Sequence, residues 1–242
     1  MQAAELTFGE VDRDLDARRE ITKWLALVAM VLDHTGKTLL PSLVLPLHFA
    51  GRLALPLFAV VIAERLVRRA ELRGKYLRRL AFWGLVAQPG YAMVTSEPEA
   101  NILFTLGLGV ALDLCLRDFR GASGARRAAL LVVAALALGF ATRCDYGIPG
   151  VLLVPALAAL ERWRPLFGGW AAGPLALAVN VIGSSAPVFV HLGALAASPM
   201  AAWLRETPVP LSRPHRFFFH AFYAGHLYLL AGLARLSEWV AG

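Results

Sequence analysis

The chain has 242 residues, of which 58% are hydrophobic and 17% are charged, and its mean hydropathy is +0.59. A water-soluble globule needs more polar surface than this composition supplies, so the composition predicts an integral membrane protein. The formal net charge of +7 does not indicate a nucleic-acid partner. No basic patch with interleaved aromatic residues is present, and the Lys and Arg residues border apolar runs.

The apolar runs are roughly 17 to 20 residues long, which is the length of a helix that crosses a bilayer. This pattern predicts an all-α fold: a polytopic transmembrane helix bundle with about nine spans. The bundle is expected over residues 21–242, after a cytoplasmic tail at residues 1–20. The expected spans are 21–40, 51–67, 76–94, 101–117, 127–142, 146–161, 166–184, 187–204 and 216–238.

Lys and Arg residues are distributed unevenly among the loops between these spans. About twenty of the 24 fall on the side of the amino terminus. Lys37, Arg143 and Arg235 fall on the other side, and Arg52 lies just inside the second span. By the positive-inside rule, we expect the amino terminus in the cytoplasm.

Polar residues near the outer ends of the first spans are the first candidates for chemistry. An ionisable group in a membrane helix is costly, which makes function a serious explanation for Asp33, His34 and Lys37. The alternative is an interfacial cluster solvated by lipid headgroups, in which Asp33 pairs with Lys37 four residues later. Arg52 is compatible with a substrate clamp and with a side chain that snorkels to the interface.

The last predicted span carries Tyr223 and His226, which share a helical face with Phe219. His226 is expected near the middle of the membrane, where it either hydrogen-bonds a neighbouring helix or lines a substrate path. The histidines of this span lack the spacing and the partners of a zinc site, so no metal is expected.

The loop ERLVRRAELRGKYLRRL, which connects the second and third spans, is dense in basic residues. Its simplest explanation is a topology signal combined with attraction to anionic lipid. The alternative is the docking of a phosphate-rich ligand, although no Gly-rich phosphate loop is present. The candidate ligand-binding residues are Arg65, Arg68, Arg69, Lys75, Arg78 and Arg79.

Six stretches occur in order along the chain: DHTGKTLLP, GRLALPLFAVVIAERL, YLRRLAFWGLVAQP, NILFTLGLG, DYGIPGVLLV and FYAGHLYLL. Together they resemble the TraX family, which is named for the F-pilin acetylase of conjugation systems and is similar to the wider group of transmembrane acyltransferases. The resemblance extends from about Trp24 to Leu230. It implies a multi-pass acetyltransferase of the bacterial inner membrane that draws acetyl-CoA from the cytoplasm. The implied acceptor is an amine or hydroxyl, such as that of a pilin or a small amine, at or beyond the membrane.

The resemblance also assigns residues to the site. The matching positions are the Asp-His pair Asp33 and His34, the arginine Arg52 that opens the second span, Asn101, the triplet Asp145, Tyr146 and Gly147, and the final-span His226. Two positions differ from the family pattern. Thr35 replaces the familiar isoleucine, and Gln88–Pro89 stands where an acidic residue is frequent, which leaves the acceptor open.

Acyl transfer from a thioester needs a base, donors for the developing oxyanion and exclusion of water. We expect His34 to be the base and Asp33 either to orient it or to hold Lys37. Arg52, Asn101 and Tyr146 are expected to polarise the thioester carbonyl, and the candidate substrate contacts are Lys37, Asp145, Tyr223 and His226. Direct transfer and a route through acetyl-His34 both stay open. A small transporter or a pilus-assembly scaffold without catalysis is the alternative, although the repeats typical of transporters are not visible.

Overall fold

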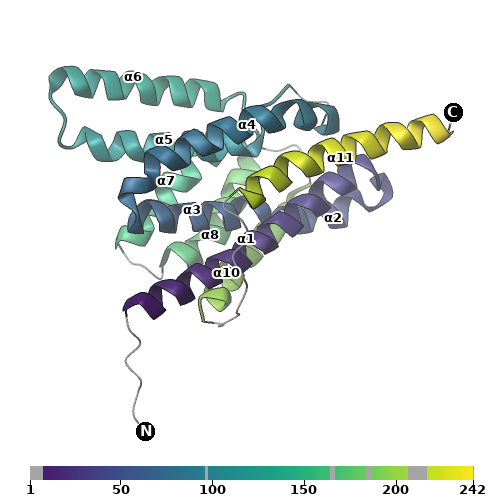
Figure 1. The fold of residues 1–242 in the computed structure, drawn as a ribbon, viewed down its shortest axis with the longest axis horizontal. Helices are drawn as coiled ribbons and strands as arrows, with labels where there is room; N and C mark the ends of the chain where they lie inside the picture. Colours follow the sequence, from purple (N-terminus) through teal and green to yellow (C-terminus); the bar gives the residue numbers. More distant parts are fainter. Residues whose placement is uncertain (1–7, 96–97, 164–166, 184–186, 207–216, 242) are drawn as a thin grey trace, which may run out of the picture.

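The structure is a computed structural model that describes residues 8–95, 98–163, 167–183, 187–206 and 217–241. All the described elements are helices, which confirms the predicted all-α class (Figure 1). They are α1 (Phe8–Thr38), η1 (Pro41–Leu43), α2 (Val44–Gly51), α3 (Ala54–Arg68), η2 (Ala70–Leu72), α4 (Arg73–Thr95), α5 (Ile102–Phe119), α6 (Gly124–Ala141), α7 (Gly147–Trp163), α8 (Phe167–Gly183), α9 (Val188–His191), η3 (Leu192–Ala196), α10 (Ala197–Glu206) and α11 (Phe218–Ala241).

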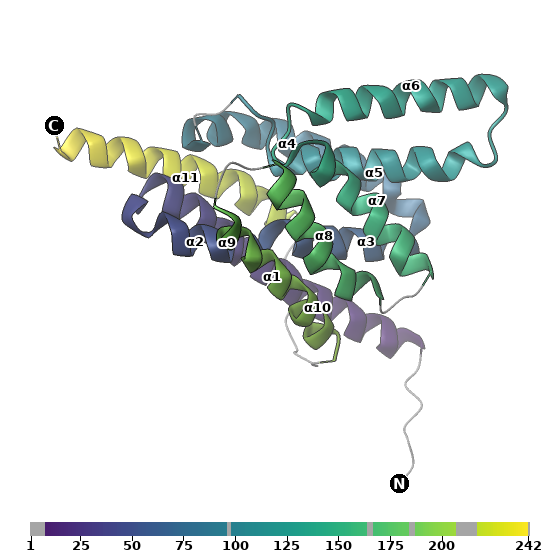
Figure 2. The same ribbon diagram turned by 180° about the vertical axis from the view of Figure 1, so that it is seen from behind.

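Helix α3 forms the centre of the bundle. It packs against α1, α5, α7 and α8, and eleven of its 15 residues are buried. A helix that is apolar on all sides is stable only when neighbours cover it, which explains this central position. Helix α11 packs along α1 and α4 on one face (Figure 1), and α8, α9 and α10 cover the opposite face (Figure 2).

Helix α1 is longer than predicted, because it begins at Phe8 instead of residue 21. The predicted polar tail is therefore helical from Phe8 onward, and residues 1–7 lie outside the described part of the chain. The segment is rich in Glu, Asp, Ala and Arg, which are polar or small but compatible with a helix. The polar composition of this segment argues against a membrane span, but it is compatible with a helix.

Helix α2 was not predicted, because residues 41–50 fall between the first two expected spans; the segment contains Pro41 and Pro46. Both prolines lie at or near the start of a helix, where the missing backbone N–H costs little. The chain bends between α2 and α3 at Arg52 and Leu53. Arg52 therefore caps α2 and does not lie inside a continuous second span.

The predicted span 187–204 is divided into α9, η3 and α10 in the structure. Gly193 lies so close to the backbone of Phe49 that a Cβ atom there would collide with the Phe49 carbonyl oxygen. The segment thus bends to let α2 and η3 approach each other. Apolar length alone could not reveal this bend.

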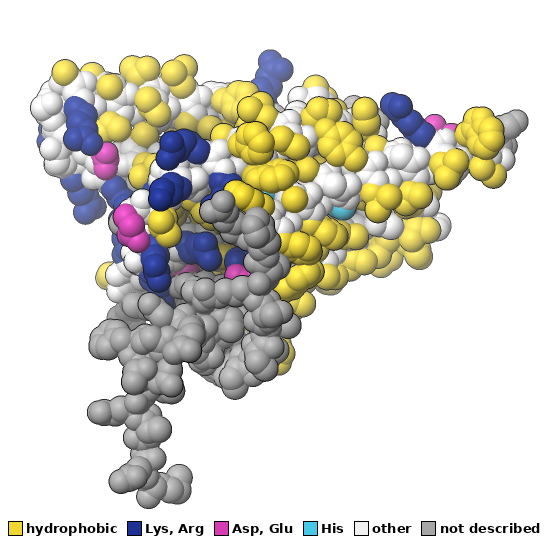
Figure 3. Space-filling view, viewed as in Figure 1, with side chains coloured by type: hydrophobic (Ala, Val, Ile, Leu, Met, Phe, Trp, Pro, Cys, Tyr) yellow, Lys and Arg dark blue, Asp and Glu magenta, His cyan; other side chains and the backbone are white. Residues whose placement is uncertain are grey.

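The surface of the molecule is unusually apolar. Leu131, Val132, Leu136 and Phe140 of α6 are exposed, and so are many apolar side chains of α4 and α11 (Figure 3). Two stretches in the described part, Pro41–Arg68 and Gly124–Ala141, are long and apolar enough to cross a membrane. Soluble monomers rarely expose apolar patches of this extent, so these features indicate a membrane protein. The count of nine spans stays a prediction.

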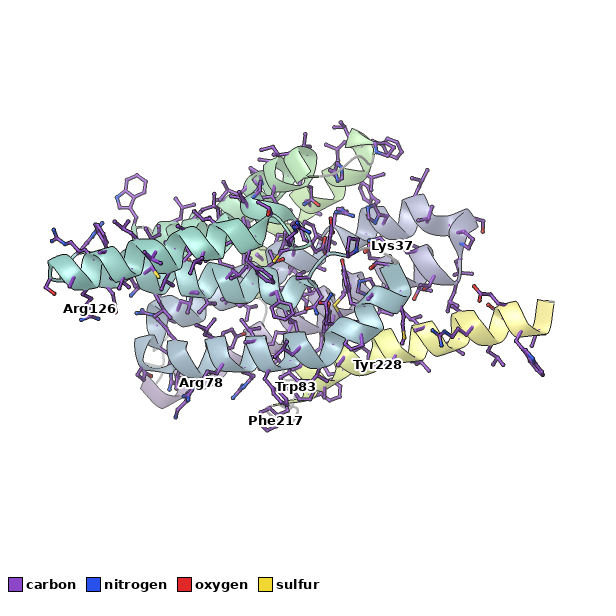
Figure 4. All side chains as sticks on the ribbon, turned by 90° about the horizontal axis from the view of Figure 1, so that it is seen from above. Lys37, Arg78, Trp83, Arg126, Phe217 and Tyr228 are labelled. Carbon is purple, nitrogen blue, oxygen red and sulfur yellow. The ribbon has the colours of Figure 1, made fainter. Side chains whose placement is uncertain are left out.

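Basic side chains gather at one end of the bundle, where the α3–α4 and α5–α6 connections lie (Figure 3). Arg78 and Arg126 lie toward this end, and Lys37 lies toward the other (Figure 4). At the basic end, the carboxylate of Asp113 is 1% exposed and is held by Arg117, at 3.2 Å, and by Arg162 of α7. We call this end, which includes η2, the basic end.

Candidate active site

The site begins with two histidines on different helices. His34 lies near the end of α1 and His226 on α11, and both are buried. Their rings are stacked with centroids 5.1 Å apart, and His34 Nδ1 lies 2.9 Å from His226 Nε2. Tyr91 of α4 packs edge-on to His34, with centroids 6.3 Å apart. The two histidines therefore form one hydrogen-bonded pair inside the bundle.

The contacts of this pair define its tautomers. His226 Nδ1 lies 3.2 Å from the carbonyl oxygen of Phe222, which can only accept, so His226 Nδ1 carries the proton. In the neutral ring His226 Nε2 is then an acceptor, and it receives the Nδ1–H of His34. His34 Nε2 is left without a proton, so it is the atom that can take one.

Asp33 points away from His34, as expected for neighbours about 100° apart on a helix. Its carboxylate accepts from Lys37 at 2.7 Å and contacts His48 of α2. Asp33 thus holds Lys37, the second of the two roles predicted for it, and joins α1 to α2. The predicted orientation of His34 is instead supplied by His226.

Close approach of α2 to Asp33 depends on Gly51. A Cβ atom at Gly51 would lie 2.5 Å from the Asp33 Cβ, whereas one at Gly74 would meet nothing within 4 Å. We expect Gly51→Ala to lower the free energy of unfolding by about 1–3 kcal/mol, because helices α1 and α2 must separate. Gly74→Ala is the matched control, with no loss expected. Melting temperatures in detergent compare the two, and equal values would contradict this prediction.

Arg52 is buried, with 7% of its surface exposed, which excludes the lipid-snorkelling explanation. Its guanidinium donates to Asn180 Oδ1 of α8 at 2.7 Å and contacts His48. It also lies over the Tyr146 ring, 5.6 Å from the centroid. Arg52 therefore joins α2 to α8 and to the start of α7.

The turn that precedes α7 is held against the start of α5. The backbone N–H of Asp145 donates to the Ala100 carbonyl at 2.8 Å, and the hydroxyl of Thr105 donates to the Asp145 carbonyl at 2.6 Å. Tyr146 and Gly147 both have positive φ, at 67° and 58°. A non-glycine residue in this conformation is uncommon, so the surrounding contacts hold Tyr146 in place.

Asn101 is completely buried and caps α5, since its Oδ1 accepts from the Leu103 N–H at 3.1 Å. Its Nδ2 donates to the Gly84 carbonyl at 2.9 Å and to Gln88 Oε1 at 2.8 Å. Gln88 Oε1 also accepts from the Asn101 N–H at 3.0 Å. Asn101 therefore joins α5 to α4.

We expect Asn101→Ala to lower the free energy of unfolding by about 2–4 kcal/mol. The helix cap contributes about 1 kcal/mol, and the buried groups left unpaired contribute the remainder. Asn101→Ser keeps an acceptor for the cap but loses the bonds to Gly84 and Gln88, so its loss should be intermediate. Thermal unfolding in detergent ranks the wild type, Asn101→Ser and Asn101→Ala by stability. A wild-type melting temperature for Asn101→Ala would contradict the prediction.

A cavity of about 250 Å³ extends from the basic end toward the histidine pair; we call it the central cavity. At the basic end it is lined by Lys23, Arg65, Arg79 and His220, and Lys23 pairs there with Glu20. Its inner part is apolar and ends at residues of α3, α5 and α11. These inner lining residues are Phe58, Val61, Ile62, Ile102, Leu103, Leu106 and Tyr223.

The central cavity ends close to the histidine pair. Tyr223 is one helical turn from His226, a rise of about 4.5 Å, and their ring centroids are 5.6 Å apart. His34 Nδ1 is in turn hydrogen-bonded to His226 Nε2. Tyr223 thus contacts both the cavity and His226, whereas neither His34 nor His226 is among the residues that line the cavity.

A smaller depression of about 100 Å³ adjoins the cavity at the basic end; we call it the basic groove. It shares Arg65, Tyr76 and Arg79 with the central cavity. Its lining residues include five cations and no carboxylate: Arg65, Arg69, Arg73, Lys75 and Arg79. Such a concentration of cations suits a polyanionic ligand.

Comparison with known proteins identifies the family. The family model for TraX protein matches residues 18–234. Protein TraX of Escherichia coli is 34% identical over 224 residues, which cover 90% of this chain and 87% of that protein. The chain belongs to the TraX family.

Other relatives of this TraX-family chain match over shorter stretches. Probable fimbrial assembly protein FimC, serogroup H1, of Dichelobacter nodosus is 32% identical over 164 residues, 61% of this chain and 64% of that protein. Protein TraX of Escherichia coli strain K12 is 35% identical over 147 residues, 60% of this chain and 57% of that protein. No solved structure matches.

Within the TraX-family chain, the predicted catalytic residues divide into separate contact groups. His34 pairs with His226, whereas Asn101 joins α4 to α5. Of the predicted cofactor residues, Arg65 and Arg79 line the central cavity, and Arg69 and Lys75 line the basic groove. Arg68 and Arg78 line neither of these. A third group is a polar network in which His48 and Asn180 connect predicted residues: Asp33, Lys37, Arg52 and Tyr146. Asp145 is held by the hydrogen bond from its backbone N–H to Ala100.

The sequence analysis missed His48 and Asn180, which connect the polar network of this TraX-family chain. Both lie in apolar surroundings, in VLPLHFA and ALAVNVIG. The rule that singled out Asp33 applies equally to them, because a polar side chain in an apolar run needs a partner. His48 was overlooked because its segment falls between the first two expected spans.

Proposed function

We propose that this chain is an integral membrane acetyltransferase that transfers acetyl from cytoplasmic acetyl-CoA to an amine or hydroxyl acceptor at the membrane or on its outer side. One observation carries the proposal. The central cavity begins among basic side chains and ends at Tyr223, one helical turn from the His34–His226 pair. The cavity would thus connect a binding site for the phosphates of coenzyme A with the histidine that acts as general base.

The phosphates of coenzyme A would bind in the basic groove. Arg65 and Arg79 belong to both the groove and the cavity, so they lie at the junction between phosphates and acyl arm. Charge-assisted hydrogen bonds from arginine to phosphate are strong and frequently bidentate. This assignment supports the cofactor role predicted for four of the six basic residues: Arg65, Arg69, Lys75 and Arg79.

The apolar inner part of the cavity would hold the acyl arm and exclude water. The whole cavity has a volume of about 250 Å³, just below the range of about 300–1,000 Å³ that is typical of ligand pockets. Phe58, Ile62 and Leu106 line this part and carry no group that could activate water. Exclusion of water protects the thioester from hydrolysis before an acceptor arrives.

His34 Nε2 would act as the general base. The acceptor nitrogen or oxygen forms a bond to the acetyl carbon while its proton passes to His34 Nε2. The C–S bond then breaks, the electron pair leaves with the sulfur, and the proton returns from His34 to the thiolate. His226 holds the His34 ring and keeps its proton on Nδ1.

The basic end would face the cytoplasm, in accordance with the positive-inside rule. Acetyl-CoA would then enter from the cytoplasm, and acetyl would leave toward the outer side. The name of the Dichelobacter relative refers to fimbrial assembly, and the sequence resembles the family of the F-pilin acetylase. We therefore propose a pilin as the acceptor.

Sidedness tests this proposal. The purified protein would be placed in vesicles with the basic end outward or inward, and acetylated acceptor would be detected by mass spectrometry. Transfer should require acetyl-CoA on the side of the basic end, and access of a protease to the amino terminus reports the orientation. Absence of acetylated product with amine and pilin acceptors in both orientations, from folded protein, would overturn the proposal.

A further inference from the structure

Two polar atoms of residues that line the central cavity have no hydrogen-bond partner among the described residues. The hydroxyl of Tyr223 is buried, with the residue 3% exposed, yet it has no hydrogen-bond partner of ordinary geometry within the described part of the chain. His220 Nδ1 is the second such atom, one helical turn closer to the basic end. Buried polar groups are rarely left unpaired because desolvation is costly, so these two indicate a polar ligand.

The first turn of α5 lies beside the Tyr223 hydroxyl. Ile102 and Leu103 line the same cavity as Tyr223. The backbone N–H of Ile102 is a donor and cannot accept the phenolic proton. The N–H groups of Asn101, Leu103 and Phe104 are already bonded, to Gln88 Oε1 and to the Asn101 oxygens. None of these N–H groups can accept the phenolic proton of Tyr223, which lines the cavity.

We infer that the Tyr223 hydroxyl and the amino-terminal end of α5 form the binding site for the carbonyl oxygen of the acyl donor. The inference rests on the proposed function, since it names the site of the thioester. The amino terminus of α5 carries partial positive charge, which would stabilise negative charge on this oxygen together with the hydrogen bond from Tyr223. The phenol is a catalytic residue in this account, as it touches the reacting carbonyl.

The step that Tyr223 stabilises is the attack on the thioester. As the bond from the acceptor to the acetyl carbon forms, the π electrons of the carbonyl move onto its oxygen. The Tyr223 proton, aimed at this oxygen, stabilises the oxyanion until the C–S bond breaks and coenzyme A leaves as thiolate. His34 holds the acceptor proton meanwhile.

The residues predicted to polarise the carbonyl are engaged elsewhere. The Arg52 guanidinium contacts Asn180, and Tyr146 lies below it. The amide nitrogen of Asn101 donates to Gly84 and Gln88. None of these three predicted residues lines the central cavity, whereas Tyr223 does.

Kinetics test the inference first. Tyr223→Phe should lower kcat by about 10²-fold, the loss typical of one oxyanion donor, while KM for acetyl-CoA changes less than about twofold. Tyr228→Phe is the matched control on the next turn of α11, where the hydroxyl donates to the Val86 carbonyl outside the cavity. It should leave both constants unchanged. Wild-type kcat in Tyr223→Phe would overturn the inference.

Binding of two unreactive analogues separates this inference from the proposed function. Acetonyl-coenzyme A keeps the carbonyl and S-ethyl-coenzyme A lacks it. Wild type and Tyr228→Phe should bind the carbonyl analogue about three- to tenfold tighter, and Tyr223→Phe should bind the two equally. If Tyr223→Phe still prefers the carbonyl analogue, the inference is overturned, while acetyl transfer by the wild type would still support the proposed function. If the preference requires Tyr223 but the wild type transfers no acetyl group, only the proposed function is overturned.

Discussion

Replacing His34 by alanine is expected to lower the rate of acetyl transfer by at least about a hundredfold, because general-base catalysis contributes about 10²–10⁴. The His34 ring has one nitrogen bonded to His226 and the other free to take a proton. Its loss removes the proton acceptor and leaves the central cavity unchanged. KM for acetyl-CoA should therefore stay near its wild-type value. Acetylated product, followed by mass spectrometry over time, provides the rate.

Substitution of His226 separates orientation from proton transfer. His226→Gln places an amide oxygen that can still accept from His34 Nδ1, whereas His226→Ala cannot. His226→Gln should thus retain more activity than His226→Ala, and both should exceed His34→Ala. Near-normal turnover of a folded His34→Ala protein would remove His34 from the role of base. A larger loss in His226→Ala than in His34→Ala would reverse the two roles.

Arg79→Ala is expected to raise KM for acetyl-CoA by about 10- to 100-fold, with a smaller effect on kcat. A hydrogen bond to a charged group contributes about 1.5–3 kcal/mol, which corresponds to this range. Arg79 lines both the central cavity and the basic groove, so it reaches the site proposed for the phosphates. Initial rates at varied acetyl-CoA measure the effect.

Arg78→Ala is the matched control, because Arg78 is the neighbouring residue on α4 but is exposed and lines neither site (Figure 4). Its KM should change less than about twofold after correction for surface electrostatics. Equal increases in KM for the two variants would show that the basic end acts only through its overall charge. The phosphate site would then not be the basic groove.

The all-α class could be predicted because hydropathy alone distinguishes long apolar helices from other folds. Helix α6 is the clearest case, since its apolar length, 18 residues, and its exposed apolar surface agree. Helix α2 and the bend at Gly193 could not be predicted in this way. Each depends on a contact between distant segments, such as that of Gly193 with Phe49.

The candidate site was predictable only in part. Asp33 and His34 were recognisable as ionisable residues in an apolar run, but their different partners were not. His226 is 192 residues away from His34 in sequence, and only the packing of α1 against α11 joins them. Similarly, Arg78 and Arg79 are equivalent in sequence, and only the structure shows that Arg79 lines the cavity.

The most direct test of the account is the release of coenzyme A thiol from acetyl-CoA by the purified wild-type protein in detergent, with and without an amine acceptor. The account predicts that release depends on the acceptor and that His34→Ala, measured beside it, releases thiol at least about a hundredfold more slowly. A folded wild-type protein that neither binds acetyl-CoA nor releases thiol would contradict the account. The transporter and scaffold alternatives would then take its place.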